Sequence, residues 1–105
     1  MNDLNLQNAE YFGIENQMIV LCEELAELSQ AAAKWLRLYR KDPTVRNTRS
    51  QIMNNLIEEL ADVSITTDQI KYLLEFSEKE IHEIRDDKIW RTAAYIERNR
   101  KKNTI

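Results

Sequence analysis

Apolar side chains recur every three or four residues along most of the chain, which is the period of an α-helix. The clearest stretch runs from about Ile14 to Lys41. Its apolar positions are Met18, Leu21, Leu25, Leu28, Ala32, Trp35, Leu36 and Tyr39. Asp42-Pro43 should end this helix, because proline lacks a backbone donor and disfavours helical geometry in the residue before it. We therefore expect a long helix followed by a connection over residues 42–47.

Two further helices are expected downstream, and each begins at a capping signal. Thr48-Arg49-Ser50-Gln51 has the spacing of a capping box and predicts a helix from Thr48 to about Phe76. Ser77 to Glu80 repeats the pattern and predicts a last helix that runs into the basic segment 98–102. The apolar positions of these two helices are Ile52, Leu56, Leu60, Val63, Ile70, Leu73 and Leu74, and then Ile81, Ile84, Ile89, Trp90 and Ile96.

The N-terminal residues favour a short helix from about Asp3 to Phe12 that ends at Gly13, because glycine readily takes the left-handed conformation that ends helices. The 105 residues contain one Gly and one Pro, too few for the turns of a β-sheet protein. The sequence therefore predicts an all-α fold, an antiparallel helical bundle of three long helices plus a short N-terminal helix. The length allows a single domain over residues 1–105.

The length of the expected helices points to association. A helix of roughly 28 residues is about 42 Å long, more than one chain of this size wraps around a single core. We therefore expect oligomerisation, as a homodimer or homotetramer, to complete the bundle. The net charge of -3 argues against binding to nucleic acid or to a membrane surface. No apolar run or N-terminal signal indicates a membrane or export, so a cytoplasmic location is expected. The single cysteine, Cys22, is expected to be a small buried residue.

The chain contains an internal repeat. Leu21-Cys22-Glu23-Glu24-Leu25-Ala26-Glu27-Leu28 recurs 35 residues later as Leu56-Ile57-Glu58-Glu59-Leu60-Ala61-Asp62-Val63, with five of eight positions identical. Glu24 and Glu59 fall inside the apolar stripes of their helices, and no Lys or Arg lies within one turn of either. A carboxylate on an apolar face costs free energy unless it is protonated, paired with a cation or bound to a metal. Two such carboxylates at equivalent positions indicate a site.

If the two repeats pack antiparallel at the same height, the carboxylates of Glu24, Glu27, Glu59 and Asp62 converge and their repulsion favours a bound divalent cation. All-oxygen ligation is typical of Mg²⁺, with Mn²⁺ possible. Glu23 and Glu58 point about 100° away and are expected in an outer shell or facing solvent. The alternative is an ordinary amphipathic pair of helices whose carboxylates lie at the polar boundary or pair with Lys and Arg.

Glu24-x-x-Glu27 followed by Glu59-x-x-Asp62 resembles the ExxE and ExxD motifs of the MazG-like all-α nucleoside triphosphate pyrophosphohydrolases, relatives of dimeric dUTPases and phosphoribosyl-ATP pyrophosphatase. The likeness covers about residues 14–74. It implies Mg²⁺-dependent hydrolysis of a (deoxy)nucleoside triphosphate to the monophosphate and pyrophosphate, a nucleotide-pool house-cleaning activity, with these four carboxylates as catalytic metal-holding residues. The gap of 31 residues between Glu27 and Glu59 is long for the motif and leaves the substrate class open.

Phosphate oxygens that no metal holds need cationic donors. Lys34 lies seven residues after Glu27 and close to its azimuth, and Lys88 and Arg91 lie one turn apart on the last helix. Trp35 and Trp90 are of a type that stacks on bases, although aromatic residues at helical spacing are more commonly core residues. The single histidine, His82, lies outside the motif and is expected to be a surface or packed residue.

Two other interpretations remain open at the level of sequence. One is a phosphoribosyl-ATP pyrophosphatase or dUTPase-like enzyme that uses the same metal site on another nucleotide. The other is a non-catalytic helical interaction module in which the carboxylates are structural and no metal binds. No motif specifies the base or sugar, because base selection depends on contacts from loops and partner chains.

Overall fold

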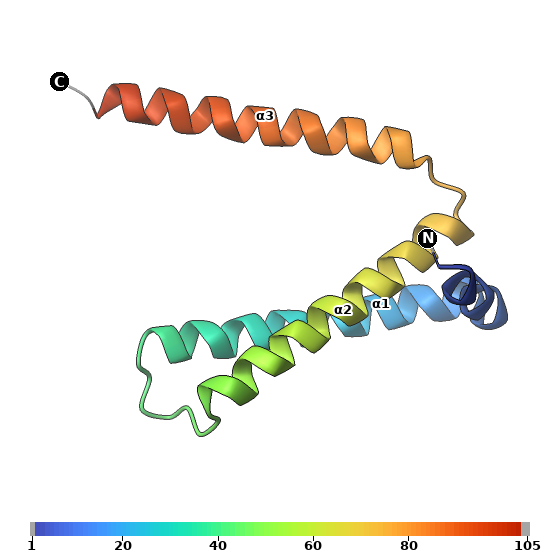
Figure 1. Ribbon diagram of the computed structural model, residues 1–105, viewed down its shortest axis with the longest axis horizontal. Coiled ribbons are helices and arrows are strands. Elements are labelled where there is room, and N and C mark those ends of the chain that lie inside the picture. The colour runs from blue at the N-terminus through green and yellow to red at the C-terminus, as the bar shows by residue number, and fades with distance from the viewer. Residues whose placement is uncertain (1, 104–105) are drawn as a thin grey trace. The chain divides into compact units, whose positions relative to one another are not determined.

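The computed structural model describes residues 2–103, and its regular structure over that range is entirely helical (Figure 1). The helices are α1 (Asp3–Tyr39), α2 (Arg49–Leu73) and α3 (Glu78–Lys102). The prediction of an all-α chain is confirmed. None of the described helices has a stretch that is both apolar enough and long enough to cross a membrane.

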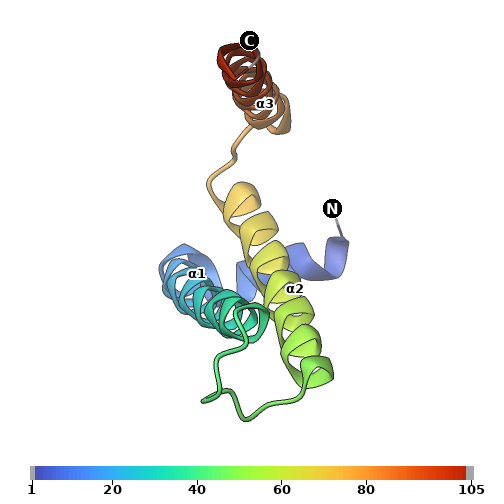
Figure 2. The same ribbon diagram turned by 90° about the vertical axis from the view of Figure 1, so that its left-hand side faces the viewer.

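Helix α1 contains both of the helical segments expected before residue 42. Gly13 interrupts it with φ 81° and ψ 166°, which are not helical values. Figures 1 and 2 show the part of α1 before Gly13 turned away from the rest. A Cβ atom added at Gly13 would meet no atom within 4 Å, so the backbone conformation, rather than a lack of space, requires glycine here. The break predicted at Gly13 is confirmed.

The connection between α1 and α2 covers residues 40–48 and begins two residues earlier than expected. Lys41 takes a positive φ of 59° just after the helix ends. The carboxylate of Asp42 then accepts hydrogen bonds from the backbone N–H of Thr44 at 2.9 Å and from its hydroxyl at 2.7 Å. These bonds, the backbone one first, hold the pKa of Asp42 below its usual value. The segment is thus an ordered turn around Pro43.

The capping signals begin helices where the sequence placed them. The Thr48 hydroxyl accepts the Gln51 N–H at 3.1 Å, and the Gln51 side chain accepts the Thr48 N–H at 2.9 Å. This is a complete capping box at the start of α2. Ser77 caps α3 by accepting the Glu80 N–H at 3.2 Å. Helix α2 ends at Leu73 rather than near Phe76, because Glu75 takes a left-handed φ of 56°.

Helices α1 and α2 pack antiparallel. Near one end of their contact the Gln17 side chain donates to Gln69 at 2.5 Å, and both residues are buried. Ten residues further along α1, Glu27 lies beside Glu59, which is ten residues earlier in α2. The register is therefore constant, and it brings the two copies of the repeat to the same height. Gln69 also donates to Asn5 at 2.9 Å, which ties the segment before Gly13 to α2.

The core between α1 and α2 is small. The buried apolar residues of the described chain are Ala9, Ala31, Ile52 and Ile70, and two of these four are alanines. Several residues of the expected apolar stripes are exposed, including Leu25 at 48% and Leu60 at 53%. The expectation that Cys22 is buried is wrong, since its side chain is exposed. Within the α1–α2 pair each helix has one neighbouring helix, so only one side of its apolar stripe is covered.

The chain forms two units, one up to Leu74 and the other from Glu75 onward. The second unit consists of α3, which has no buried residue. Trp90 is 76% exposed. The interpretation of this tryptophan as a core residue is therefore wrong, because it is not buried within the second unit. Exposed charges line much of this helix, and Arg91 lies 2.7 Å from Asp87 in an ion pair one turn apart.

Candidate metal centre

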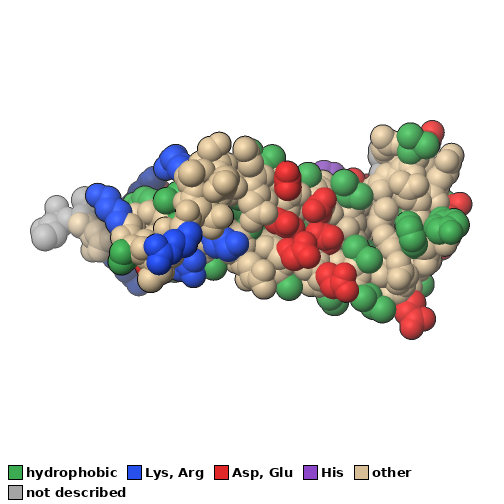
Figure 3. Space-filling model, turned by 90° about the horizontal axis from the view of Figure 1, so that it is seen from below, with side chains coloured by type: hydrophobic (Ala, Val, Ile, Leu, Met, Phe, Trp, Pro, Cys, Tyr) green, Lys and Arg blue, Asp and Glu red, His purple; other side chains and the backbone are tan. Residues whose placement is uncertain are grey.

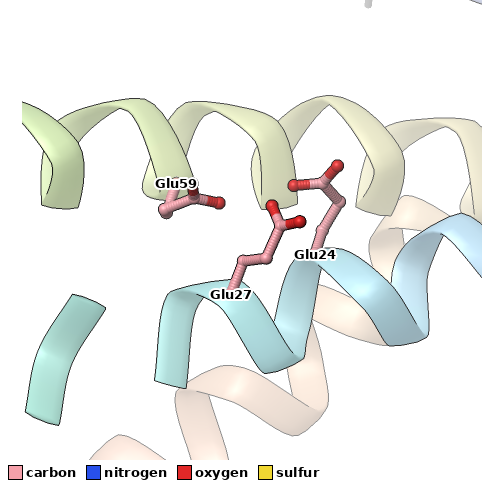
Figure 4. A group of neighbouring side chains, drawn as sticks. All are labelled: Glu24, Glu27 and Glu59. Carbon is pink, nitrogen blue, oxygen red and sulfur yellow. The ribbon is translucent and has the colours of Figure 1, made fainter. Parts of the chain in front are cut away.

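Three carboxylates from α1 and α2 meet at the middle of the helix contact (Figure 4). Glu24 and Glu27 lie one turn apart on α1, and Glu59 approaches them from α2. Each offers one oxygen, and the three oxygens lie within 4.8 Å of one another. The antiparallel register thus brings together side chains that are more than thirty residues apart in the sequence.

Asp62, the fourth predicted ligand, is half-buried one turn after Glu59 on α2. It lies outside the group of three but is near enough to act on Glu24, because its charge is the strongest of the neighbouring charges that raise the pKa of Glu24. Glu27 acts on Glu59 in the same way, because its charge is the strongest of the neighbouring charges that raise the pKa of Glu59. Glu24 faces Asp62 as Glu59 faces Glu27, so the repeat produces a local twofold arrangement of carboxylates.

The site is electrostatically unfavourable as it stands. Burial is the first cause of the raised pKa of both Glu24 and Glu59, and the neighbouring carboxylates add to it. One oxygen of each, Oε2, is buried and has no hydrogen-bond partner within the described residues. Across residues 2–103, no Lys or Arg forms a salt bridge with any of the four carboxylates. Buried oxygens of this kind are normally paired.

The donor set fits a hard divalent cation. All the candidate ligand atoms are carboxylate oxygens, which Mg²⁺ and Mn²⁺ accept, and a bound cation would supply a partner for the two unpartnered Oε2 atoms. Glu27 is exposed while Glu24 and Glu59 are half-buried, so the cluster opens to solvent on one side. Glu23 and Glu58 are exposed, as their azimuth predicts. The arrangement can hold a cation and leave part of its coordination sphere to water or a ligand.

Lys34 lies on α1 two turns beyond Glu27 and lines a pocket of about 330 Å³. Asn47, Gln51, Ile52 and Asn55 form the rest of the lining. The three amides are residues that sequence reasoning missed. A signal for two of them was present, because Gln51, Asn55 and Glu59 recur at intervals of four and share one face of α2.

Basic side chains gather near the same end of the helix pair. Residues 34–49 carry six cations against one carboxylate, Asp42, and all six cations are exposed. Figure 3 shows Asp and Glu side chains grouped near the middle of one face and Lys and Arg side chains grouped to their left. The cations of this basic segment are Lys34, Arg37, Arg40, Lys41, Arg46 and Arg49.

The remaining predicted residues lie elsewhere or have other partners. Lys88 and Arg91 belong to α3, in the second unit, and their contact with a substrate stays a prediction. His82 is also on α3, 3.8 Å from Glu78 and largely exposed, so it is a surface histidine. Trp35 is half-buried and stacks on Tyr39 with ring centroids 5.3 Å apart.

Comparisons of the chain with models of protein families, with curated proteins and with solved structures find no match.

Proposed function

We propose that the protein is a hydrolase that cleaves a (deoxy)nucleoside triphosphate to the monophosphate and pyrophosphate with the help of Mg²⁺. The observation that carries the proposal is the cluster of Glu24, Glu27 and Glu59, in which two buried oxygens have no partner among the described residues. A site of this kind is costly to keep in a small protein unless a cation binds there. Its position on one exposed side of the helix pair leaves room for a substrate.

Glu24, Glu27, Glu59 and Asp62 would hold Mg²⁺, or Mn²⁺ in its place. When bound, such an ion neutralises phosphate oxygens and lowers the pKa of a water molecule. The carboxylates act as acceptors that orient the attacking water. In the reaction, the water oxygen bonds to one phosphorus of the α–β anhydride, the bridging oxygen leaves with the other phosphorus, and a proton goes to solvent.

A polyphosphate substrate accounts for the basic segment beside the carboxylates. Carboxylates alone repel a triphosphate. Its binding therefore needs a metal ion at the cluster and basic side chains nearby. Lys34 is the cation best placed on α1 for this role. Lys88 and Arg91 of α3 remain the next candidates for phosphate binding.

We further propose that the active form is a homodimer or homotetramer whose helices complete an antiparallel bundle. The four small or medium apolar residues buried between α1 and α2 make a weak core for one chain, and many large apolar side chains are exposed. The exposed thiol of Cys22 suits a reducing compartment, which supports a cytoplasmic location.

The test is incubation of the purified protein with each NTP and dNTP in Mg²⁺, with products analysed for pyrophosphate and for phosphate. We expect pyrophosphate from at least one nucleotide. Replacing any one of the four carboxylates by its amide should lower turnover at least about 100-fold, since the metal supplies several kcal/mol of charge stabilisation. Glu83→Gln removes an exposed carboxylate of α3 outside the cluster and serves as the control, which should keep parental turnover.

Two results would count against the proposal. If no nucleotide yields pyrophosphate and calorimetry detects neither Mg²⁺ nor Mn²⁺ binding, the carboxylates are structural and the chain is a helical interaction module. If Glu83→Gln loses as much activity as Glu59→Gln, the loss reflects overall charge rather than the cluster.

A further inference from the structure

The pocket around Lys34 lies between the carboxylates and the α1–α2 connection. Along α1 the order is Glu27, then buried Ala31, then Lys34, and along antiparallel α2 it is Glu59, then Asn55, then Gln51. Ala31, between Glu27 and Lys34, is 1% exposed. The side chains along the helix pair therefore change from acidic to amide and basic toward the α1–α2 connection.

We propose that the pocket lined by Lys34, Asn47, Gln51 and Asn55 binds the β- and γ-phosphates of the triphosphate, the part that leaves as pyrophosphate. The pocket thereby fixes the direction in which the nucleotide lies across the carboxylates. The choice of ligand rests on the proposed function, since it assumes that the substrate is a nucleoside triphosphate.

The chemistry of the lining suits a condensed phosphate. Lys34 supplies a positive charge, and each of the three amides carries an NH₂ group that donates hydrogen bonds to phosphate oxygens. None of the lining residues is acidic. A volume of about 330 Å³ is near the lower bound of about 300 Å³ for small-molecule pockets, which suits pyrophosphate better than a whole nucleotide.

The distribution of charge selects the orientation. The β- and γ-phosphates together carry more negative charge than the α-phosphate, so they are attracted more strongly to the basic segment 34–49. The reverse orientation would place the most anionic end of the substrate on the far side of the carboxylates, away from these cations. In the proposed orientation the α–β bond lies over the carboxylates, and the nucleoside extends past them away from the α1–α2 connection.

The experiment measures binding of the two products separately by calorimetry in Mg²⁺ at fixed ionic strength. Lys34→Met should raise the Kd of inorganic pyrophosphate about tenfold, because a charge-assisted contact is lost. Asn55→Leu, which replaces an amide by an apolar side chain of similar volume, should raise the Kd of pyrophosphate less but measurably. Both variants should leave the Kd of the nucleoside monophosphate within about twofold of the parent value. Lys79→Met removes the same charge from α3 and is the matched control, expected to keep the parental affinity for pyrophosphate.

The outcomes separate this inference from the proposed function. If the protein hydrolyses nucleotides but Lys34→Met binds pyrophosphate as tightly as the parent, the pocket is not the pyrophosphate site. If Lys34→Met weakens the monophosphate and not pyrophosphate, the orientation is reversed and the inference is wrong. If no nucleotide is hydrolysed and pyrophosphate still binds through Lys34, the phosphate site stands and the hydrolase proposal fails. Circular dichroism of both variants should match the parent, which shows that the fold is intact.

Discussion

Glu24 and Glu59 each place one oxygen where neither solvent nor a donor from the described chain reaches it. The folded protein therefore holds the protons of these carboxyls more tightly than the unfolded chain does, and their pKa values lie above the usual value. A raised carboxyl pKa destabilises the folded state as soon as the group ionises. The effect is absent at pH values below the unfolded pKa, and it grows as pH rises from there through the folded pKa.

This sign gives a prediction for the metal-free protein. The thermal midpoints of Glu24→Gln and Glu59→Gln should equal or exceed that of the parent at neutral pH, and the difference should shrink below about pH 4, where the parent carboxyls are protonated. Differences between variant and parent are the quantity to compare, because the carboxyls outside the cluster contribute equally to both. Added Mg²⁺ should raise the midpoint of the parent more than that of either variant.

The opposite pattern would exclude a metal site. Carboxylates held in salt bridges stabilise the folded state, so their amides would melt at lower temperature, and Mg²⁺ would not change the midpoint of the parent. Glu83→Gln provides the baseline for neutralising an exposed carboxylate, for which the change should stay within about 0.5 kcal/mol.

The sequence was sufficient to find these carboxylates but not the pocket beside them. Glu24 and Glu59 stand out because each breaks an apolar stripe, and the repeat marks both at once. Lys34 was found by its azimuth alone. Asn47 gave no such signal, since polar residues are ordinary near a helix start. Its place in the pocket beside Lys34 depends on the path of the α1–α2 connection, which no local pattern specifies.

At the scale of the elements, helix starts were predicted well because they are set by local chemistry. Thr48 and Ser77 cap α2 and α3 through side chains that accept the backbone N–H three residues later. Exposure was predicted poorly, as at Leu25 and Cys22. Burial depends on how many neighbours a helix has, and periodicity shows only which face is apolar.

Gly13 offers a test of an element boundary. Its φ of 81° with ψ of 166° is a backbone conformation that residues other than glycine rarely adopt. Gly13→Ala should lower the free energy of unfolding by about 1–3 kcal/mol, through backbone strain rather than a clash. Urea unfolding followed by circular dichroism measures this change.

Ser29→Ala, at an exposed position of regular helix in α1, is the matched control and should stay within about 0.5 kcal/mol of the parent. An alanine at residue 13 that left stability unchanged would show that α1 runs straight through this position without cost.

At the scale of the whole molecule, the exposed apolar surface of α1 is the feature that calls for a partner. A mostly apolar depression of about 420 Å³ on α1 is lined by Ile14, Glu15, Met18, Ile19 and Cys22. We expect the protein to sediment as a dimer or larger species at micromolar concentration. Cys22 reports on this surface, so its labelling by a thiol reagent should slow as protein concentration rises.

A stable 12.5 kDa monomer across that concentration range would contradict the expected association. Association with unchanged Cys22 labelling would instead assign the interface to another surface. Met18→Lys should weaken self-association by placing a charge in the depression, whereas Lys79→Met on α3 changes net charge without touching it.

The placement of the carboxylates halfway along the α1–α2 contact bears on how the hairpin moves. On one side of them a hydrogen bond joins buried Gln17 to buried Gln69, and on the other side, toward the connection, Ala31 and Ile52 are buried. Mutual repulsion thus acts between two places where the helices bury side chains. The central turns should separate transiently more often than the ends do, and a cation held by Glu24 and Glu59 would keep them closed. Cation binding and local opening of the hairpin then belong to one equilibrium, between a closed hairpin that holds the cation and an open one that does not.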